Sequence, residues 1–160
     1  MPSKLVTDCS KIISEHNLTI AFAESATAGR LASEFSLTPD SGSVLKGGLV
    51  CYDACVKEDI LMIPKGLVEE FTPESAEVTE EMALQLRKFI ESDIQVATTG
   101  LPSSGGSETD KKPVGTMFGH ILIREKSIAV HRVFTGTPEQ IILQSIDQIA
   151  ETIINELRQN

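Results

Sequence analysis

The sequence predicts an α/β protein, a three-layer α/β/α sandwich with a mixed, mostly parallel sheet. Short apolar runs of strand length alternate with segments of helical periodicity, and no repeat or linker interrupts this order. The chain has 160 residues, of which 41% are hydrophobic. A chain of this size can bury a core without a disulfide or a metal ion, so we expect one domain over residues 1–160.

The spacing of apolar residues predicts each element in turn. Apolar residues recur every three to four positions in the helical segments and form unbroken runs in the buried strands. The expected helices cover residues 5–16, 31–35, 57–62, 64–71, 78–89 and 138–157. The expected strands cover residues 18–23, 44–52, 94–98, 116–123 and 128–134, with a loop at 39–43.

Capping residues mark some of the helix boundaries. Thr137 to Gln140 combine proline at the first helical position with a Thr-x-x-Gln capping box, so the last helix should begin there. Thr72-Pro73 and Thr79 compete as the start of the preceding long helix. The last two strands are joined tightly through Glu125-Lys126, which predicts an antiparallel pair.

Composition limits the classes of partner. The formal net charge is −9 and no block of lysine or arginine stands out, which disfavours nucleic acid as a partner. No apolar run is long enough for a signal peptide or a membrane span, so a cytoplasmic protein is expected. Cys9, Cys51 and Cys55 form no metal-binding pattern and are expected as free thiols in a reducing compartment. We expect no cofactor.

Three groups of polar or small residues follow strand ends. They are Glu24-Ser25, Tyr52, and Thr99-Gly100 with the polar loop 101–112. Because ligands of open α/β sheets bind beyond the carboxyl ends of the strands, these groups should share one site. Backbone N–H groups of the glycine-rich loop could hold a small anion, although a flexible surface loop is an equal alternative.

Ser25 and Lys57 could form a nucleophile and base pair. Ser25 is expected at a helix N-terminus, where free N–H groups could stabilise an oxyanion, or where it could simply cap the helix. Lys57 could accept the serine proton if burial lowers its pKa, and otherwise it is a surface lysine. Tyr52 is either an assisting group or a half-buried aromatic residue at a strand end.

Read together, these segments resemble the C-terminal domain of the competence/damage-inducible CinA family. The family pattern Ala-Glu-Ser-Cys-Thr-Gly-Gly corresponds to residues 23–29, and Gly-Gly-Val-Val-x-Tyr corresponds to residues 47–52, followed by Lys57. The third segment, Thr-Gly-x-Ala-Gly-Pro-Gly-Gly with Lys-Pro-Val-Gly-Thr-Val, corresponds to residues 99–106 and 112–117. The resemblance covers nearly the whole chain as a single CinA C-terminal-like domain.

Stand-alone members of this family include nicotinamide mononucleotide deamidases, which hydrolyse the carboxamide and release ammonia. The resemblance implies a homodimer, a small-molecule nucleotide as substrate, and roles for Ser25 as nucleophile, Lys57 as base and Tyr52 as assistant. The small residues of the matching motifs are the predicted substrate-binding positions: Thr27, Gly29, Gly47, Thr99, Gly100, Gly105 and Gly106.

The chain departs from the family pattern in three places. Ala26 and Ala28 replace a cysteine and a glycine, and Pro102-Ser103-Ser104 replaces Ala-Gly-Pro. Gly136-Thr137-Pro138 and Ile142 stand where family members usually carry Gly-Asp-Arg and a further arginine. Each lost charge-assisted bond to a substrate costs about 1.5–3 kcal/mol. Two other readings therefore stay open: a catalytically silent homologue that binds a nucleotide or a protein, and a Ser–Lys amidohydrolase acting on another amide.

Overall fold

Five strands form one sheet in the computed structural model, which describes residues 1–159. Their order across the sheet is β2-β1-β3-β4-β5. The strands are β1 (Ile20–Glu24), β2 (Leu45–Val50), β3 (Ile94–Gly100), β4 (Thr116–Ile123) and β5 (Lys126–Val133). β1 pairs in parallel with β2 and β3, whereas β4 runs antiparallel to both β3 and β5. Only β4 runs against the others, so the predicted mixed sheet is confirmed.

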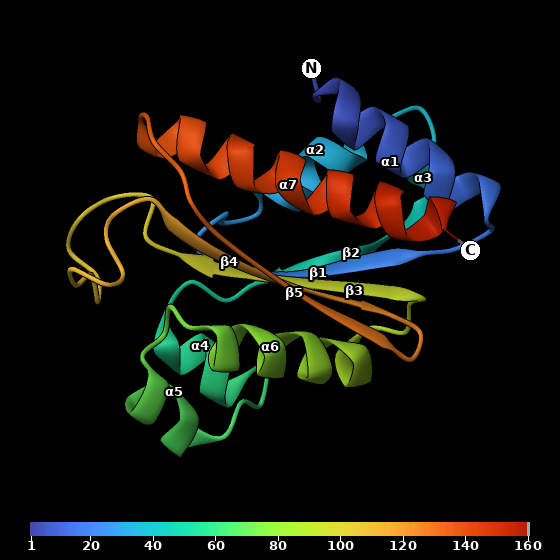
Figure 1. The fold of residues 1–160 in the computed structure, drawn as a ribbon. Coiled ribbons are helices and arrows are strands. Elements are labelled where there is room, and N and C mark those ends of the chain that lie inside the picture. Colours follow the sequence, from blue (N-terminus) through green and yellow to red (C-terminus); the bar gives the residue numbers. More distant parts are fainter. Residues whose placement is uncertain (160) are drawn as a thin grey trace.

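Helices cover both faces of this sheet (Figure 1). One layer holds α1 (Lys4–Glu15), α2 (Arg30–Ser36), α3 (Ser41–Val44) and α7 (Pro138–Arg158). The other layer holds α4 (Ala54–Asp59), α5 (Lys65–Phe71) and α6 (Ala76–Phe89). The predicted three-layer sandwich is confirmed. Within residues 1–159, no helix has the length and apolar character that a membrane crossing requires.

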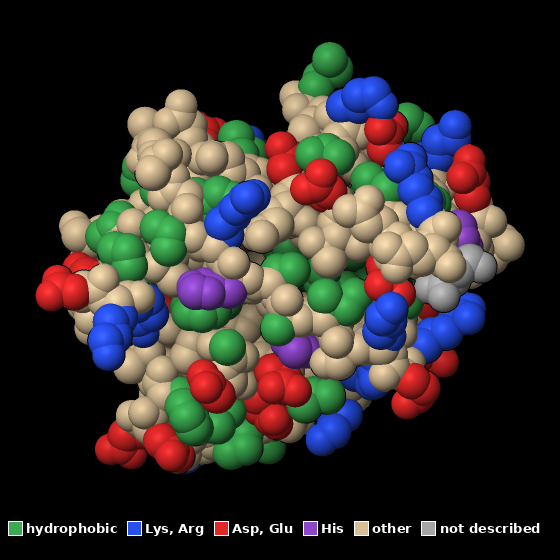
Figure 2. All heavy atoms as spheres, viewed as in Figure 1, with side chains coloured by type: hydrophobic (Ala, Val, Ile, Leu, Met, Phe, Trp, Pro, Cys, Tyr) green, Lys and Arg blue, Asp and Glu red, His purple; other side chains and the backbone are tan. Residues whose placement is uncertain are grey.

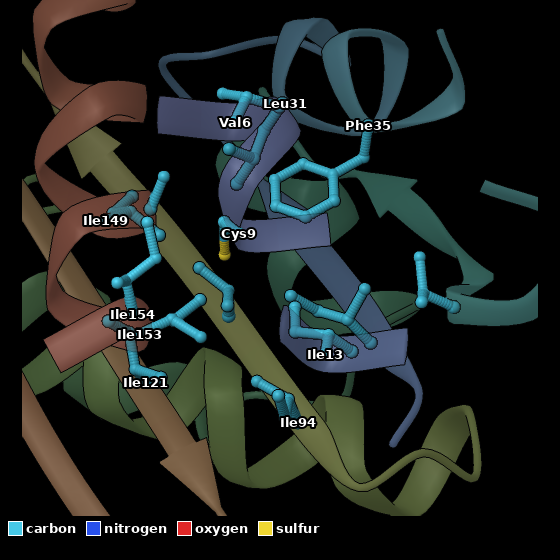
Figure 3. Close-up of a cluster of buried hydrophobic side chains, with 14 of the residues drawn as sticks. Val6, Cys9, Ile13, Leu31, Phe35, Ile94, Ile121, Ile149, Ile153 and Ile154 are labelled. Atoms are coloured by element: carbon cyan, nitrogen blue, oxygen red, sulfur yellow. The ribbon is translucent and has the colours of Figure 1, made fainter. Parts of the chain in front are cut away.

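The larger core lies between the sheet and the layer of α1, α2 and α7. Figure 3 shows Cys9 of α1, Phe35 of α2 and Ile153 of α7 turned toward Ile94 and Ile121 on the sheet. All of these side chains are buried. Each fully buried aliphatic side chain contributes about 1.5–3 kcal/mol, so this cluster fixes how the helices sit on the strands.

A second core fills the opposite face of the sheet. Successive residues of a strand point to opposite sides, so Ala21 and Ala23 of β1 face this layer while Phe22 faces the other. Val78 and Met82 of α6 are buried against this face. Every residue of β1 is buried because helices cover both faces of the sheet, which explains its unbroken apolar sequence.

Three local expectations are wrong. The helix expected at 57–62 is α4, which begins three residues earlier because Asp53 caps it. The N-cap of α6 is Ser75, whose hydroxyl accepts from Val78 N at 3.3 Å, and neither Thr72 nor Thr79 takes that place. The expected loop at 39–43 contains the start of the one-turn helix α3. By contrast, the Thr137 capping box and the antiparallel pairing of β4 with β5 are confirmed.

Two glycines shape the pairing of β2 with β1, one through its backbone angle and the other through the close approach of the strands. The register between these strands shifts between Ile20 and Ala21, opposite Gly47, whose φ of 143° disfavours other residues. A Cβ at Gly48 would lie 2.8 Å from the carbonyl oxygen of Phe22. This close pairing positions the end of β2 at Val50 and therefore Tyr52, which follows two residues later.

The carboxylate of Glu24 fixes the turn between β1 and α2. Glu24 is 1% exposed and is the last residue of β1. Its Oε2 accepts from the Thr27 hydroxyl at 2.6 Å, from Gly29 N at 3.0 Å and from Leu31 N at 2.9 Å. Its Oε1 accepts from Ala32 N at 2.8 Å. A carboxylate at a helix N-terminus satisfies free N–H groups and the positive end of the helix dipole.

We predict that Glu24→Gln lowers the free energy of unfolding by about 1–3 kcal/mol, because an amide nitrogen replaces one acceptor and faces backbone donors. Chemical denaturation with equal m-values would measure this loss. Glu69→Gln, at an exposed position of α5, is the matched control and should change stability by less than about 0.5 kcal/mol. Equal stability of the two variants would contradict the capping role.

Candidate active site

A cavity of about 200 Å³ lies where β1, β2 and β3 end. The strand ends contribute Ser25, Tyr52 and Gly100, and the loop after β3 covers one side. The residues that line the cavity are Ser25, Ala26, Tyr52, Glu74, Gly100, Leu101, Pro102, Ser103, Ser104, Gly105 and Gly106. The three groups that the sequence places after strand ends therefore meet at one location.

Ser25 is held by β3 and leaves its hydroxyl free. It directly follows β1, is 8% exposed, and donates its backbone N–H to Thr98 O at 3.0 Å. None of the described residues forms a hydrogen bond with its Oγ, so this group is available to a molecule in the cavity. α2 begins only at Arg30, with Gly29 as N-cap, so the expected place of Ser25 at a helix N-terminus is wrong.

The turn after Ser25 has an unusual backbone. Ala28 has a φ of 48° and Gly29 a φ of 90°. The left-handed region costs an alanine about 1–2 kcal/mol, and Ala28 stands at the position where the CinA pattern has glycine. Ala28 N donates to Ser25 O at 3.0 Å, whereas Ala26 N donates to no acceptor among residues 1–159. The N–H of Ala26 is thus a free donor on the residue next to Ser25, and both residues line the cavity.

Lys57 is buried beneath Tyr52. It lies in α4, which Asp53 caps by accepting from Cys55 N at 2.8 Å, and the Lys57 side chain turns back into the protein. Lys57 is 1% exposed, so the alternative of a surface lysine is wrong. Its Nζ donates to Tyr52 O at 3.0 Å. Burial lowers the pKa of Lys57 from its ordinary value of 10.5, and the charges of Cys51, Glu74 and Asp53 oppose that shift.

No hydrogen bond joins Ser25 to Lys57 in the described chain, and Lys57 does not line the cavity. Tyr52 connects the two positions, because its carbonyl oxygen binds Lys57 while the residue itself lines the cavity with Ser25. The Tyr52 residue is 67% exposed, more than the predicted half-buried aromatic. The amine of Lys57 therefore contacts the backbone of a residue that lines the cavity but does not line the cavity itself.

The amides of the glycine-rich loop already have an acceptor. Gly105 N and Gly106 N each donate at 2.8 Å to a different oxygen of Glu108. These bonds lower the pKa of Glu108. The carboxylate of Glu108 therefore occupies the two loop amides at which the sequence predicts a small anion.

Lys112 anchors the same loop to the segment before α6. Its Nζ donates to Thr72 Oγ1 at 2.7 Å, to Glu74 O at 2.8 Å and to Ser107 Oγ at 2.8 Å. Ser107 in turn donates to Glu74 Oε2. This network ties the loop to the segment before α6 and places Glu74 beside the loop in the cavity lining.

The other predicted binding residues lie outside the cavity lining. Thr27 is buried and its Oγ1 also bonds with Thr98 Oγ1 at 2.8 Å, while Thr99 Oγ1 bonds with Thr79 Oγ1 at 2.8 Å. Gly29 and Gly47 shape the turn and the strand described above. The structure brings Ser25, Tyr52, Gly100, Gly105 and Gly106 together and places Lys57, Thr27, Gly29, Gly47 and Thr99 around them.

Glu74 is the cavity residue that sequence reasoning missed. It directly precedes the true N-cap of α6, so correct assignment of Ser75 as the cap would have drawn attention to it. No residue pattern relates Glu74 to the three strand-end motifs, because its approach depends on the loop network. Within residues 1–159, no cluster of three His, Cys, Asp or Glu residues is arranged to hold a metal ion.

The fold and this cavity define a class of α/β domain with a candidate nucleophile after its first strand. The sequence model of the CinA C-terminal domain matches residues 2–157, and the chain belongs to this family.

Several relatives have similar sequences. The chain is 38% identical over 132 residues to a CinA-like protein of Petrotoga mobilis, covering 81% of the chain and 32% of the relative. It is 36% identical over 149 residues to a putative competence-damage inducible protein of Clostridioides difficile, covering 93% and 34%, respectively. The chain thus spans about one third of the length of these relatives.

Solved structures agree with the fold. A CinA superfamily protein from Escherichia coli has a TM-score of 0.87 at 25% identity, covering 94% of this chain and 87% of that one. A CinA superfamily protein from Klebsiella pneumoniae has a TM-score of 0.91 at 22% identity, covering 98% of both chains.

We predict that Lys112→Met loosens the loop without unfolding the domain. Three hydrogen bonds of the ammonium group are lost, so amide hydrogen exchange at residues 103–108 should accelerate several-fold while exchange in β3 is unchanged. Lys111→Met is the matched control, since Lys111 is its exposed neighbour. Unchanged loop exchange in Lys112→Met would show that the network does not hold the loop.

Proposed function

We propose that this domain is an amidohydrolase that removes the carboxamide nitrogen of a nicotinamide nucleotide, with Ser25 as nucleophile and Lys57 as base. The observation that carries this proposal is the unpaired Ser25 hydroxyl in a cavity, with the free N–H of Ala26 beside it and a buried lysine behind Tyr52. A serine needs an adjacent base to attack an amide, and a lysine with a lowered pKa can supply one.

In the proposed reaction, Ser25 Oγ attacks the carboxamide carbon while the neutral amine of Lys57 accepts the hydroxyl proton. The N–H of Ala26 donates to the oxyanion that develops on the former carbonyl oxygen. The C–N bond then breaks, and the Lys57 ammonium returns its proton to the leaving ammonia. Water attacks the acyl-serine next, which releases the carboxylic acid and restores the Ser25 hydroxyl.

The hydrogen bond between Ser25 and Lys57 must form when substrate binds, because the structure shows none. Catalytic hydrogen bonds are often long before substrate arrives and shorten in the reacting complex. The same observation favours a second candidate function, a silent homologue that binds a nucleotide or a partner without turnover. Retention of a buried amine beside the cavity favours the enzyme, since a buried lysine carries a desolvation cost.

We expect wild-type protein to release ammonia from nicotinamide mononucleotide, and Ser25→Ala to lower kcat by about 10³-fold or more. Coupled detection of ammonia at saturating substrate would measure both. Ser33→Ala, at an exposed position of α2, is the matched control and should retain activity. If wild type and Ser25→Ala release ammonia equally slowly while ligand binds, the silent homologue is the correct function. Turnover of other amides alone would indicate a different substrate.

We predict that activity rises with pH through the ionisation of Lys57. Only the neutral amine can accept a proton, and burial lowers the Lys57 pKa, so the midpoint of log kcat against pH should lie below 10.5. Lys57→Met keeps the volume of the side chain and should abolish this limb together with most activity.

Lys65→Met removes an exposed lysine of α5 and serves as the control for the pH profile. A rising limb that survives in Lys57→Met would show that another group is the base. A thermal melt of each variant separates loss of catalysis from loss of folding.

A further inference from the structure

The cavity lining lacks the groups that usually bind a phosphate. A phosphate is held by cationic side chains or by free backbone N–H groups. Glu74 is the one charged residue among those that line the cavity, and it is acidic. A substrate that carries its phosphate into this cavity would therefore meet a like charge and no lysine or arginine of the described chain.

The basic residues that could neutralise a phosphate do not line the cavity, and two of them bond to other groups. Arg30 donates to Glu34 at 2.7 Å and to Glu139 at 3.2 Å, on the side of α2 that meets the start of α7. Lys112 has its three acceptors in the loop network, and it holds Glu74 by its backbone oxygen without an ion pair to the carboxylate. Lys46 and Lys111 are exposed and do not line the cavity. On the face shown in Figure 2, basic and acidic side chains are interspersed.

The loop amides cannot replace these cations while Glu108 occupies them. Gly105 N and Gly106 N donate to the two oxygens of one carboxylate, and successive backbone N–H groups are also the donors that bind phosphate oxygens in other proteins. A phosphate must first displace Glu108 from these amides and then meet the carboxylate of Glu74, whose Oε1 lies 3.5 Å from the point that a Cβ of Gly106 would occupy. Both steps reduce affinity for an anion.

Glu74 is instead placed to receive a cation or a donor. Ser107 donates to its Oε2, whereas none of the residues 1–159 donates to its Oε1. A carboxamide riboside carries the positive charge of its pyridinium ring, and its ribose hydroxyls are donors. A phosphate leaves the ring charge in place but adds about two negative charges at pH 7, so the mononucleotide is a net anion. Repulsion by Glu74 and the absence of a phosphate site in the cavity lining therefore both disfavour the mononucleotide relative to the riboside.

We propose that this cavity selects cationic carboxamide nucleosides over their phosphorylated forms, with Glu74 as the specificity-determining residue and Glu108 as the group that closes the loop amides to anions. This inference replaces the nucleotide of the proposed function with the corresponding nucleoside as the preferred ligand. Turnover of that ligand rests on the proposed function, whereas the binding preference does not.

Titration calorimetry on Ser25→Ala, which should bind without turnover, tests the preference with nicotinamide riboside and nicotinamide mononucleotide as probes. Both probes share the pyridinium charge, so their difference comes from the phosphate. One unfavourable charge contact near a protein surface corresponds to about tenfold or more in affinity, so the riboside should bind at least about tenfold tighter. Adding Glu74→Gln should reduce that ratio several-fold. Adding Glu108→Gln should strengthen binding of the mononucleotide alone. Glu70→Gln, an exposed carboxylate of α5, is the matched control.

Equal or tighter binding of the mononucleotide by Ser25→Ala, a ratio that Glu74→Gln leaves unchanged, or no binding of either probe would overturn the inference. Ammonia assays on the otherwise wild-type protein separate it from the proposed function. Riboside-selective binding without ammonia release would refute the deamidase and leave the selectivity standing. Ammonia release together with equal or tighter binding of the mononucleotide would refute the selectivity and leave the deamidase standing.

Discussion

The geometry of the site depends on one buried carboxylate, that of Glu24. A buried carboxylate is stable only when hydrogen bonds replace its hydration, and Glu24 has four donors from the turn and from the first turn of α2. These bonds determine where α2 begins and hold Ala28 in a left-handed conformation that it would not adopt alone. Because the Glu24 side chain points into the protein, the side chain of the next residue, Ser25, points to the cavity.

The same interaction recurs across the cavity. Glu108 accepts from two loop amides as Glu24 accepts from the amides of α2. In both places the sequence suggests free N–H groups ready for an anion or oxyanion, and in both places a carboxylate of the chain itself is the acceptor. The N–H of Ala26 remains the free donor closest in sequence to Ser25.

Sequence patterns predicted the features that depend on local spacing. The β4–β5 hairpin, the capping box of α7 and the meeting of Ser25, Tyr52 and the loop follow from periodicity, caps and the geometry of parallel strands. Features that depend on distant contacts could not be predicted in this way. The partners of Glu24, the burial of Lys57 and the approach of Glu74 through Ser107 each need the folded chain. The cap of α6 was missed because three hydroxyl residues compete within eight positions.

The burial of Lys57 is difficult to explain by stability alone. No carboxylate of residues 1–159 forms an ion pair with it, and one backbone carbonyl, that of Tyr52, accepts from its Nζ. Burying a charged amine costs free energy that a methionine or leucine of similar volume would not. Burial lowers the lysine pKa and so favours the neutral amine, which is the form that can accept a proton. A base beside a cavity needs that property, whereas a structural lysine does not, so the cost of burial is itself an argument for chemistry at Ser25.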